Sequence, residues 1–143
     1  MVRKLSFAFA LVFVLVVVTG WMPHFVTDTH MTMDGPERTL FGLFGMSILD
    51  DVTHGLSALL LLAASIKSRK ASLLALTAFG WYYACDASFF LIDGFIIHKP
   101  IVANILLNLP HVIISTIMLG MVYGLAPRED LRLGTARVAT SAG

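Results

Sequence analysis

The hydrophobic residues of this chain are grouped in four long runs, which are separated by polar or charged residues. The runs cover residues 5–21, 45–66, 71–92 and 101–125. A helix needs roughly 20 mostly apolar residues to cross a bilayer, and each run is close to that length. The pattern therefore predicts an all-α membrane protein, a bundle of four transmembrane helices within residues 1–127. We expect residues 128–143 to form a disordered, polar cytoplasmic tail.

The sequence leaves two points open, whether the first run is cleaved off as a signal peptide and where the second helix begins. The first run follows Arg3 and Lys4, an arrangement that is also typical of a signal peptide. No small-x-small cleavage site follows the run, because the next residues read VTGWMP. We therefore expect the first helix to be retained as a signal anchor. The start of the second helix is not sharply marked and falls between Leu40 and Ser47.

The composition supports a membrane location and excludes some classes of function. Hydrophobic residues make up 57% of the 143 residues and charged residues 13%, and the mean hydropathy is +0.84. A soluble domain of this size could not bury so much apolar surface. The net charge of +1 provides no basis for nucleic-acid binding. The single cysteine, Cys85, cannot form an internal disulfide.

The basic residues predict the orientation of the helices. Lysine and arginine are enriched in the short cytoplasmic loops of bacterial membrane proteins. With a cytoplasmic N-terminus, two basic residues lie outside, Arg38 and Lys99, and eight lie inside: Arg3, Lys4, Lys67, Arg69, Lys70, Arg128, Arg132 and Arg137. The sequence thus predicts a multi-pass protein of a bacterial-type inner membrane with both termini in the cytoplasm.

Polar residues recur at spacings of three and four within the last three runs, so each set lies on one helix face. Such residues are costly in lipid and normally face the interior of a bundle. We therefore predict a polar cluster between the helices, formed by Asp51, His54, Tyr82, Asp86, Asn104, Asn108, His111 and Ser115. Counted from the cytoplasmic helix ends, His54, Asp86 and His111 all lie about 18 to 21 Å from the inner boundary, in the outer half of the bilayer.

The second and fourth runs resemble each other at an offset of 57 residues, which places residues 51–54 over residues 108–111. This weak repeat predicts two related helical hairpins. The segment from Leu40 to Gly45, followed by Asp51-x-x-His54, resembles a family of small four-helix bacterial membrane proteins of unknown function. That family has Asn/Asp-x-x-His motifs in helices two and four, and Asn108 and His111 match the second of them. The resemblance implies a fold and no activity.

The predicted cluster allows several interpretations. The polar groups could only fix the helix register through hydrogen bonds. His54 and His111 lie at one height on parallel helices, as a haem b would require, and with Asp51 and Asp86 they could instead bind zinc or iron. An aspartate beside a histidine, with Tyr82 as a donor, could also serve proton-coupled transport or acid–base chemistry on a lipophilic substrate.

The external segment between the first two runs contains a second candidate metal site. Its residues His24, His30, Met31 and Met33 carry imidazole and thioether groups, which suit copper(I). The alternative is that Trp21 and the methionines simply rest at the membrane interface.

The leading functional hypothesis is an accessory or binding subunit in a larger membrane complex, and a non-enzymatic role is favoured over catalysis. Haem- or metal-dependent redox chemistry is the second hypothesis, and a small intramembrane enzyme or proton-coupled carrier is the third. The expected partners are the lipid bilayer and other membrane subunits or a second copy of the chain. Nucleic acid is not expected as a partner.

Overall fold

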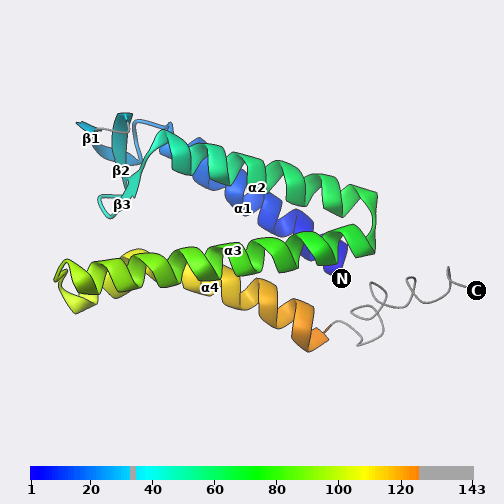
Figure 1. Ribbon diagram of the computed structural model, residues 1–143. Helices are drawn as coiled ribbons and strands as arrows, with labels where there is room; N and C mark the ends of the chain where they lie inside the picture. Colours follow the sequence, from blue (N-terminus) through cyan, green and yellow to red (C-terminus); the bar gives the residue numbers. More distant parts are fainter. Residues whose placement is uncertain (33–34, 126–143) are drawn as a thin grey trace, which may run out of the picture.

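A computed structural model describes residues 1–32 and 35–125. These residues form four helices, α1 (Val2–Gly20), α2 (Ile48–Lys67), α3 (Arg69–Ile96) and α4 (Ile101–Leu125). Between α1 and α2 they form three strands, β1 (Val26–Thr32), β2 (Gly35–Leu40) and β3 (Phe44–Met46) (Figure 1). The mostly helical fold agrees with the prediction from the four apolar runs. The predicted tail, residues 128–143, lies outside the described residues.

Three of the described helices are long and apolar enough to cross a membrane: Val2–Gly20, Ile48–Lys67 and Ile101–Gly124. The helix α3 is the longest, with 28 residues, but is less apolar because Trp81, the two following tyrosines and Asp86 interrupt it. The described helices therefore support a membrane protein with three candidate spans.

The segment between α1 and α2 forms strands, not the loop that we expected from the sequence. The strands β1, β2 and β3 form an antiparallel sheet in that order. Strand β1 contains four β-branched residues, Val26, Thr27, Thr29 and Thr32, and such residues favour extended backbone. The sharp turn from β2 to β3 uses two residues with positive φ, Phe41 at 54° and Gly42 at 69°.

The start of α2 is defined by a capping box. The Ser47 hydroxyl accepts a hydrogen bond from the Asp50 backbone N–H, while the Asp50 carboxylate accepts one from the Ser47 backbone N–H. This reciprocal arrangement satisfies two backbone donors that would otherwise lack a partner at a helix start. The helix therefore begins at the late end of the range that the sequence allowed.

The helices form two hairpins, α1 packed on α2 and α3 packed on α4, and the hairpins contact each other mainly through α2 and α3. Only Ser68 separates α2 from α3, and the hairpins meet at this turn (Figure 1). At about 1.5 Å per residue, α2 with 20 residues is about 30 Å long and α3 with 28 residues about 42 Å. The longer hairpin therefore extends beyond α1 and α2, and the sheet occupies the space beyond their ends (Figure 1).

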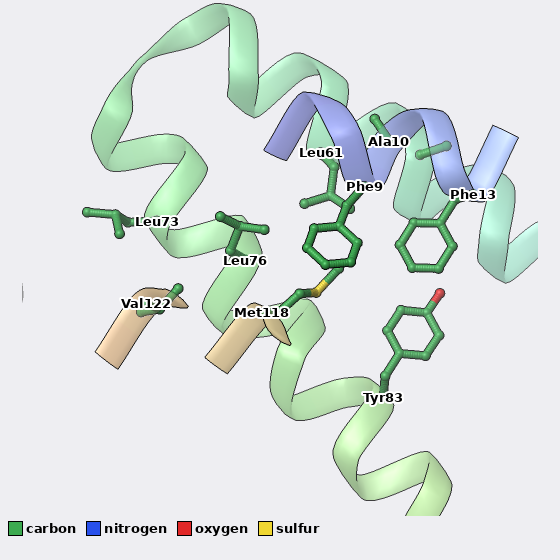
Figure 2. Close-up of a cluster of buried hydrophobic side chains, with 10 residues drawn as sticks. Phe9, Ala10, Phe13, Leu61, Leu73, Leu76, Tyr83, Met118 and Val122 are labelled. Carbon is green, nitrogen blue, oxygen red and sulfur yellow. The ribbon is translucent and has the colours of Figure 1, made fainter. Parts of the chain in front are cut away.

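A hydrophobic core joins all four helices (Figure 2). Its buried members are Phe9, Ala10, Phe13, Ala58, Leu61, Leu73, Leu76, Tyr83, Met118 and Val122. The outward faces are also apolar, and Leu15, Leu59 and Leu74 are all exposed. Apolar residues on both faces are expected for helices that are surrounded by lipid.

The basic residues near the N-terminus lie at the same end of the bundle as the α2–α3 turn. Arg3 donates hydrogen bonds to the backbone oxygens of Ser65 (2.6 Å) and Ile66 (3.0 Å), near the carboxyl end of α2. A cation is favourable there because the last carbonyl groups of a helix carry partial negative charge. Lys67, Arg69 and Lys70 follow directly, so one end of the described bundle is strongly basic.

Candidate functional site

One ring from each helix meets in a single layer of the bundle. Phe13 of α1 stacks on Tyr83 of α3 at 5.0 Å between ring centroids (Figure 2). His54 of α2 lies 5.6 Å from Phe13 and 6.1 Å from Tyr83. His111 of α4 lies 5.2 Å from Tyr83 and 6.1 Å from His54. We call these four side chains the ring layer.

Asp86 adds a carboxylate to the ring layer. Its Oδ2 atom lies 2.7 Å from Nδ1 of His111, and the two side chains are 22% and 28% exposed. The N–H group of the ring is not aligned with the oxygen, so the contact is an ion pair by distance, while Oδ2 has no hydrogen-bond partner. Such a group is costly in a low-dielectric interior unless another molecule satisfies it.

Two further hydrogen bonds hold the rings in place. The Nδ1 atom of His54 lies 2.7 Å from the Asp50 backbone oxygen, one turn earlier on α2. The Tyr83 hydroxyl lies 3.0 Å from the Ser57 hydroxyl, which donates its own hydrogen to the Thr53 backbone oxygen at 2.8 Å. Both His54 and Tyr83 are buried, so their orientation is set by packing as well as by these bonds.

The structure brings together three of the residues that the sequence singled out, His54, Asp86 and His111. The fourth, Tyr82, is 47% exposed and lies outside the ring layer. Its neighbour Tyr83, which is only 1% exposed, takes that place. One residue corresponds to a rotation of about 100° around a helix, so the inward face of α3 was misplaced by that angle. A better signal was the row of small residues Gly80 and Ala87, which flank Tyr83 at spacings of three and four.

Asp51 does not belong to the ring layer, contrary to our expectation. Its carboxylate forms a buried ion pair with Arg38 of β2. Arg38 also donates a hydrogen bond to the Gly20 backbone oxygen at 2.8 Å and lies over the Trp21 ring, 4.1 Å from its centroid. We call these four residues the sheet anchor, because they connect β2 to the ends of α1 and α2. The sequence placed Arg38 in an external loop and provided no indication of this contact.

Of the remaining polar residues of α4, Asn104 bonds to α3, and Asn108 and Ser115 bond within α4. Asn104 is buried and donates a hydrogen bond to the Leu91 backbone oxygen at 2.9 Å, and Asn108 donates one to the Asn104 backbone oxygen at 2.8 Å. The side chain of Asn104 fills the space beside Gly94, where an added Cβ would lie 2.1 Å from its Oδ1. Ser115 is buried, and its hydroxyl donates to the Val112 backbone oxygen at 3.1 Å. These residues face inward as predicted but bind backbone groups.

The structure groups part of the proposed metal and haem ligand set. Within residues 1–32 and 35–125, no three histidine, cysteine or acidic side chains are grouped as metal ligands. Asp51 is engaged by Arg38, which leaves His54, His111 and Asp86 of the predicted set. The Tyr83 ring packs beside both imidazoles and forms a triangle of ring centroids with them.

The structure describes only part of the candidate ligand set between α1 and α2. His24 packs edge-on against Phe25, and Met31 is 78% exposed on β1. His30 lies on β1 as well, while Met33 lies outside the described residues. The part of this segment that the structure describes thus provides no support for a copper site.

Comparison with known proteins assigns a family and no activity. Residues 3–97 match the family described as Domain of unknown function (DUF4383). The chain belongs to this family. The match covers α1, the sheet, α2 and α3, so it includes His54, Tyr83 and Asp86 and ends before His111. This agrees with the expectation of an uncharacterised family, although the predicted motifs of helices two and four are not confirmed. No curated protein and no solved structure matches the chain.

Proposed function

We propose that this DUF4383 protein is a binding subunit of a bacterial-type inner membrane, which holds the polar group of a membrane-soluble ligand at the ring layer. Asp86 carries the proposal. Its Oδ2 atom is buried and has no hydrogen-bond partner, yet the side chain and the neighbouring His111 are partly exposed. A rotation of these two partly exposed side chains would open this buried oxygen to an incoming hydroxyl or amide without unfolding the bundle.

The proposal requires that all four helices span the bilayer. The helix α3 packs along α4, which is itself a candidate span, so α3 shares its environment. The charged residues of α3 are compatible with a span because Arg69 and Lys70 lie at its start and Asp93 near its end. The fourth, Asp86, faces His111. The basic residues at the α2–α3 turn favour a cytoplasmic location for this end of the bundle.

This topology can be tested by cysteine labelling. In a Cys85→Ser background, Lys99→Cys is expected to react in intact cells with a membrane-impermeant maleimide, because it lies in the predicted external α3–α4 connection. Ser68→Cys, in the predicted cytoplasmic turn, is expected to react only after permeabilisation. Equal labelling of both variants in intact cells would contradict four spans.

Ligand binding can be tested on the purified protein. We expect mass spectrometry of organic extracts to find a lipophilic species enriched with the wild type and lost from Asp86→Ala. Asp93→Ala is the matched control, because Asp93 lies on the same helix about two turns away and is also partly exposed. Identical extracts from all three proteins, each confirmed as folded by circular dichroism, would argue against a ligand at the ring layer.

The Asp86–His111 contact favours a second function, proton exchange with the ligand. An imidazole that is oriented by a carboxylate is a common arrangement in general acid–base catalysis. If the protein transfers a proton, then His111→Gln is expected to retain ligand binding but to lose the chemical change of the ligand. A variant that loses both would favour simple binding.

A further inference from the structure

Hydrogen bonds within the bundle use the donors of His54 and Tyr83 and leave their acceptors free. We infer that the site selects a ligand that donates a hydrogen bond from a neutral hydroxyl group, such as a long-chain alcohol or an alkylated hydroquinone. This inference rests on the proposed function and specifies the ligand class. It follows from the protonation that each short contact requires.

His54 presents an acceptor to the site. Its Nδ1 atom lies 2.7 Å from a backbone carbonyl oxygen, that of Asp50, which can only accept a hydrogen bond. Nδ1 must therefore carry the hydrogen, and in the neutral ring Nε2 has a free lone pair. His111 lies beside this acceptor, 6.1 Å from His54 between ring centroids, and its Nδ1 atom is 2.7 Å from Oδ2 of Asp86.

Tyr83 has also used its donor. The Ser57 hydroxyl donates to the Thr53 backbone oxygen, so in its contact with Tyr83 it must accept. The Tyr83 hydroxyl is then the donor of that 3.0 Å hydrogen bond, and its oxygen keeps acceptor capacity.

Asp86 completes an acceptor-rich surface. Its Oδ2 atom lacks an aligned donor, and an ionised carboxylate can only accept. A ligand carbonyl or ether placed here would be repelled, because its oxygen lone pairs would face those of Oδ2. A ligand hydroxyl would instead donate a hydrogen bond to Oδ2. A neutral hydroxyl is also favoured over an ammonium group, because transferring a charge into the bilayer is costly.

A matched pair of probes tests the inference. Decylhydroquinone and decylbenzoquinone share their tail and ring but differ in donor groups. The full chain, labelled with ¹⁵N-histidine, is placed in phosphatidylcholine nanodiscs, whose lipid headgroups have no donors, and is titrated under argon. We expect about tenfold tighter binding of the hydroquinone, the effect of one hydrogen bond to a charged acceptor. The signals of His54 and His111 should move, and that of His24 should not.

Variants and a second lipid define the controls. Asp86→Asn introduces an amide donor, so it is expected to reduce the tenfold preference toward equal binding, while Asp93→Asn retains it. In nanodiscs with phosphatidylglycerol, a shift of the same signals without probe, together with weaker hydroquinone binding, would identify headgroup hydroxyls as the source of the donor.

The two proposals fail in different ways. If the quinone binds as tightly as the hydroquinone and shifts the same histidines, the ligand class is wrong but the ring layer remains a binding site. If neither probe nor phosphatidylglycerol shifts His54 or His111, the proposed function is overturned, and this inference with it.

Discussion

The sheet anchor leads to the most specific stability prediction. Replacing Arg38 with methionine keeps most of the aliphatic length of the side chain but removes its charge and its donors. The change leaves the carboxylate of Asp51 buried at 8% exposure without its counter-ion. The Asp51 Oδ1 atom already lacks a hydrogen-bond partner, so the variant would leave both carboxylate oxygens without a donor from Arg38.

The expected loss of unfolding free energy follows from the burial of both Arg38 and Asp51. Their side chains are 9% and 8% exposed, so solvent screens the pair only weakly. Breaking such a pair by removing one partner typically costs about 3–5 kcal/mol, mostly because an uncompensated charge remains buried. The double variant Arg38→Met/Asp51→Leu removes both charges, and we expect it to lie within about 1–2 kcal/mol of the wild type. The two single changes should therefore be strongly non-additive.

Unfolding by sodium dodecyl sulfate, followed by circular dichroism, measures these differences. The fluorescence of Trp21 reports locally, because Arg38 lies over its ring, and a Trp81→Phe background removes the other tryptophan. Arg3→Met is the matched control: Arg3 donates to backbone oxygens at the opposite end of α2, and we expect its loss to cost about 1 kcal/mol. A cost for Arg38→Met no larger than this, or a double variant that is the sum of the singles, would refute the buried ion pair.

Two further substitutions test the packing of α3. Gly94→Ala places a Cβ 2.1 Å from the Asn104 side chain, so it should destabilise the α3–α4 hairpin by about 1–3 kcal/mol in the same assay, whereas Gly120→Ala meets no atom within 4 Å and should have little effect. Equal effects would mean that α3 and α4 do not approach closely there. Tyr83→Phe removes the hydrogen bond to the serine of α2 and should cost about 1 kcal/mol, while Tyr82→Phe changes an exposed side chain and should be nearly neutral. A larger loss of stability for Tyr82→Phe than for Tyr83→Phe would place Tyr82, and not Tyr83, in the core.

Local patterns in the sequence were sufficient to predict the mostly helical fold and the common height of the two histidines along the bundle. Runs of apolar residues identify helices because a bilayer requires length and apolarity together. The height of His54, Asp86 and His111 followed from counting residues, since every α-helix rises by nearly the same amount per residue. The observed ring distances and the Asp86–His111 contact agree with that calculation.

The rotation of α3 and the partner of Asp51 could not be obtained in this way. When a helix is apolar on most sides, its periodicity does not reveal which face is inward, and packing against Phe13 and His111 selects Tyr83. The pairing of Arg38 with Asp51 joins residues 13 positions apart through a strand and a helix. Rise per residue is a local property of the backbone and can be read from the sequence, whereas rotation and pairing depend on contacts between segments that only the folded chain brings together.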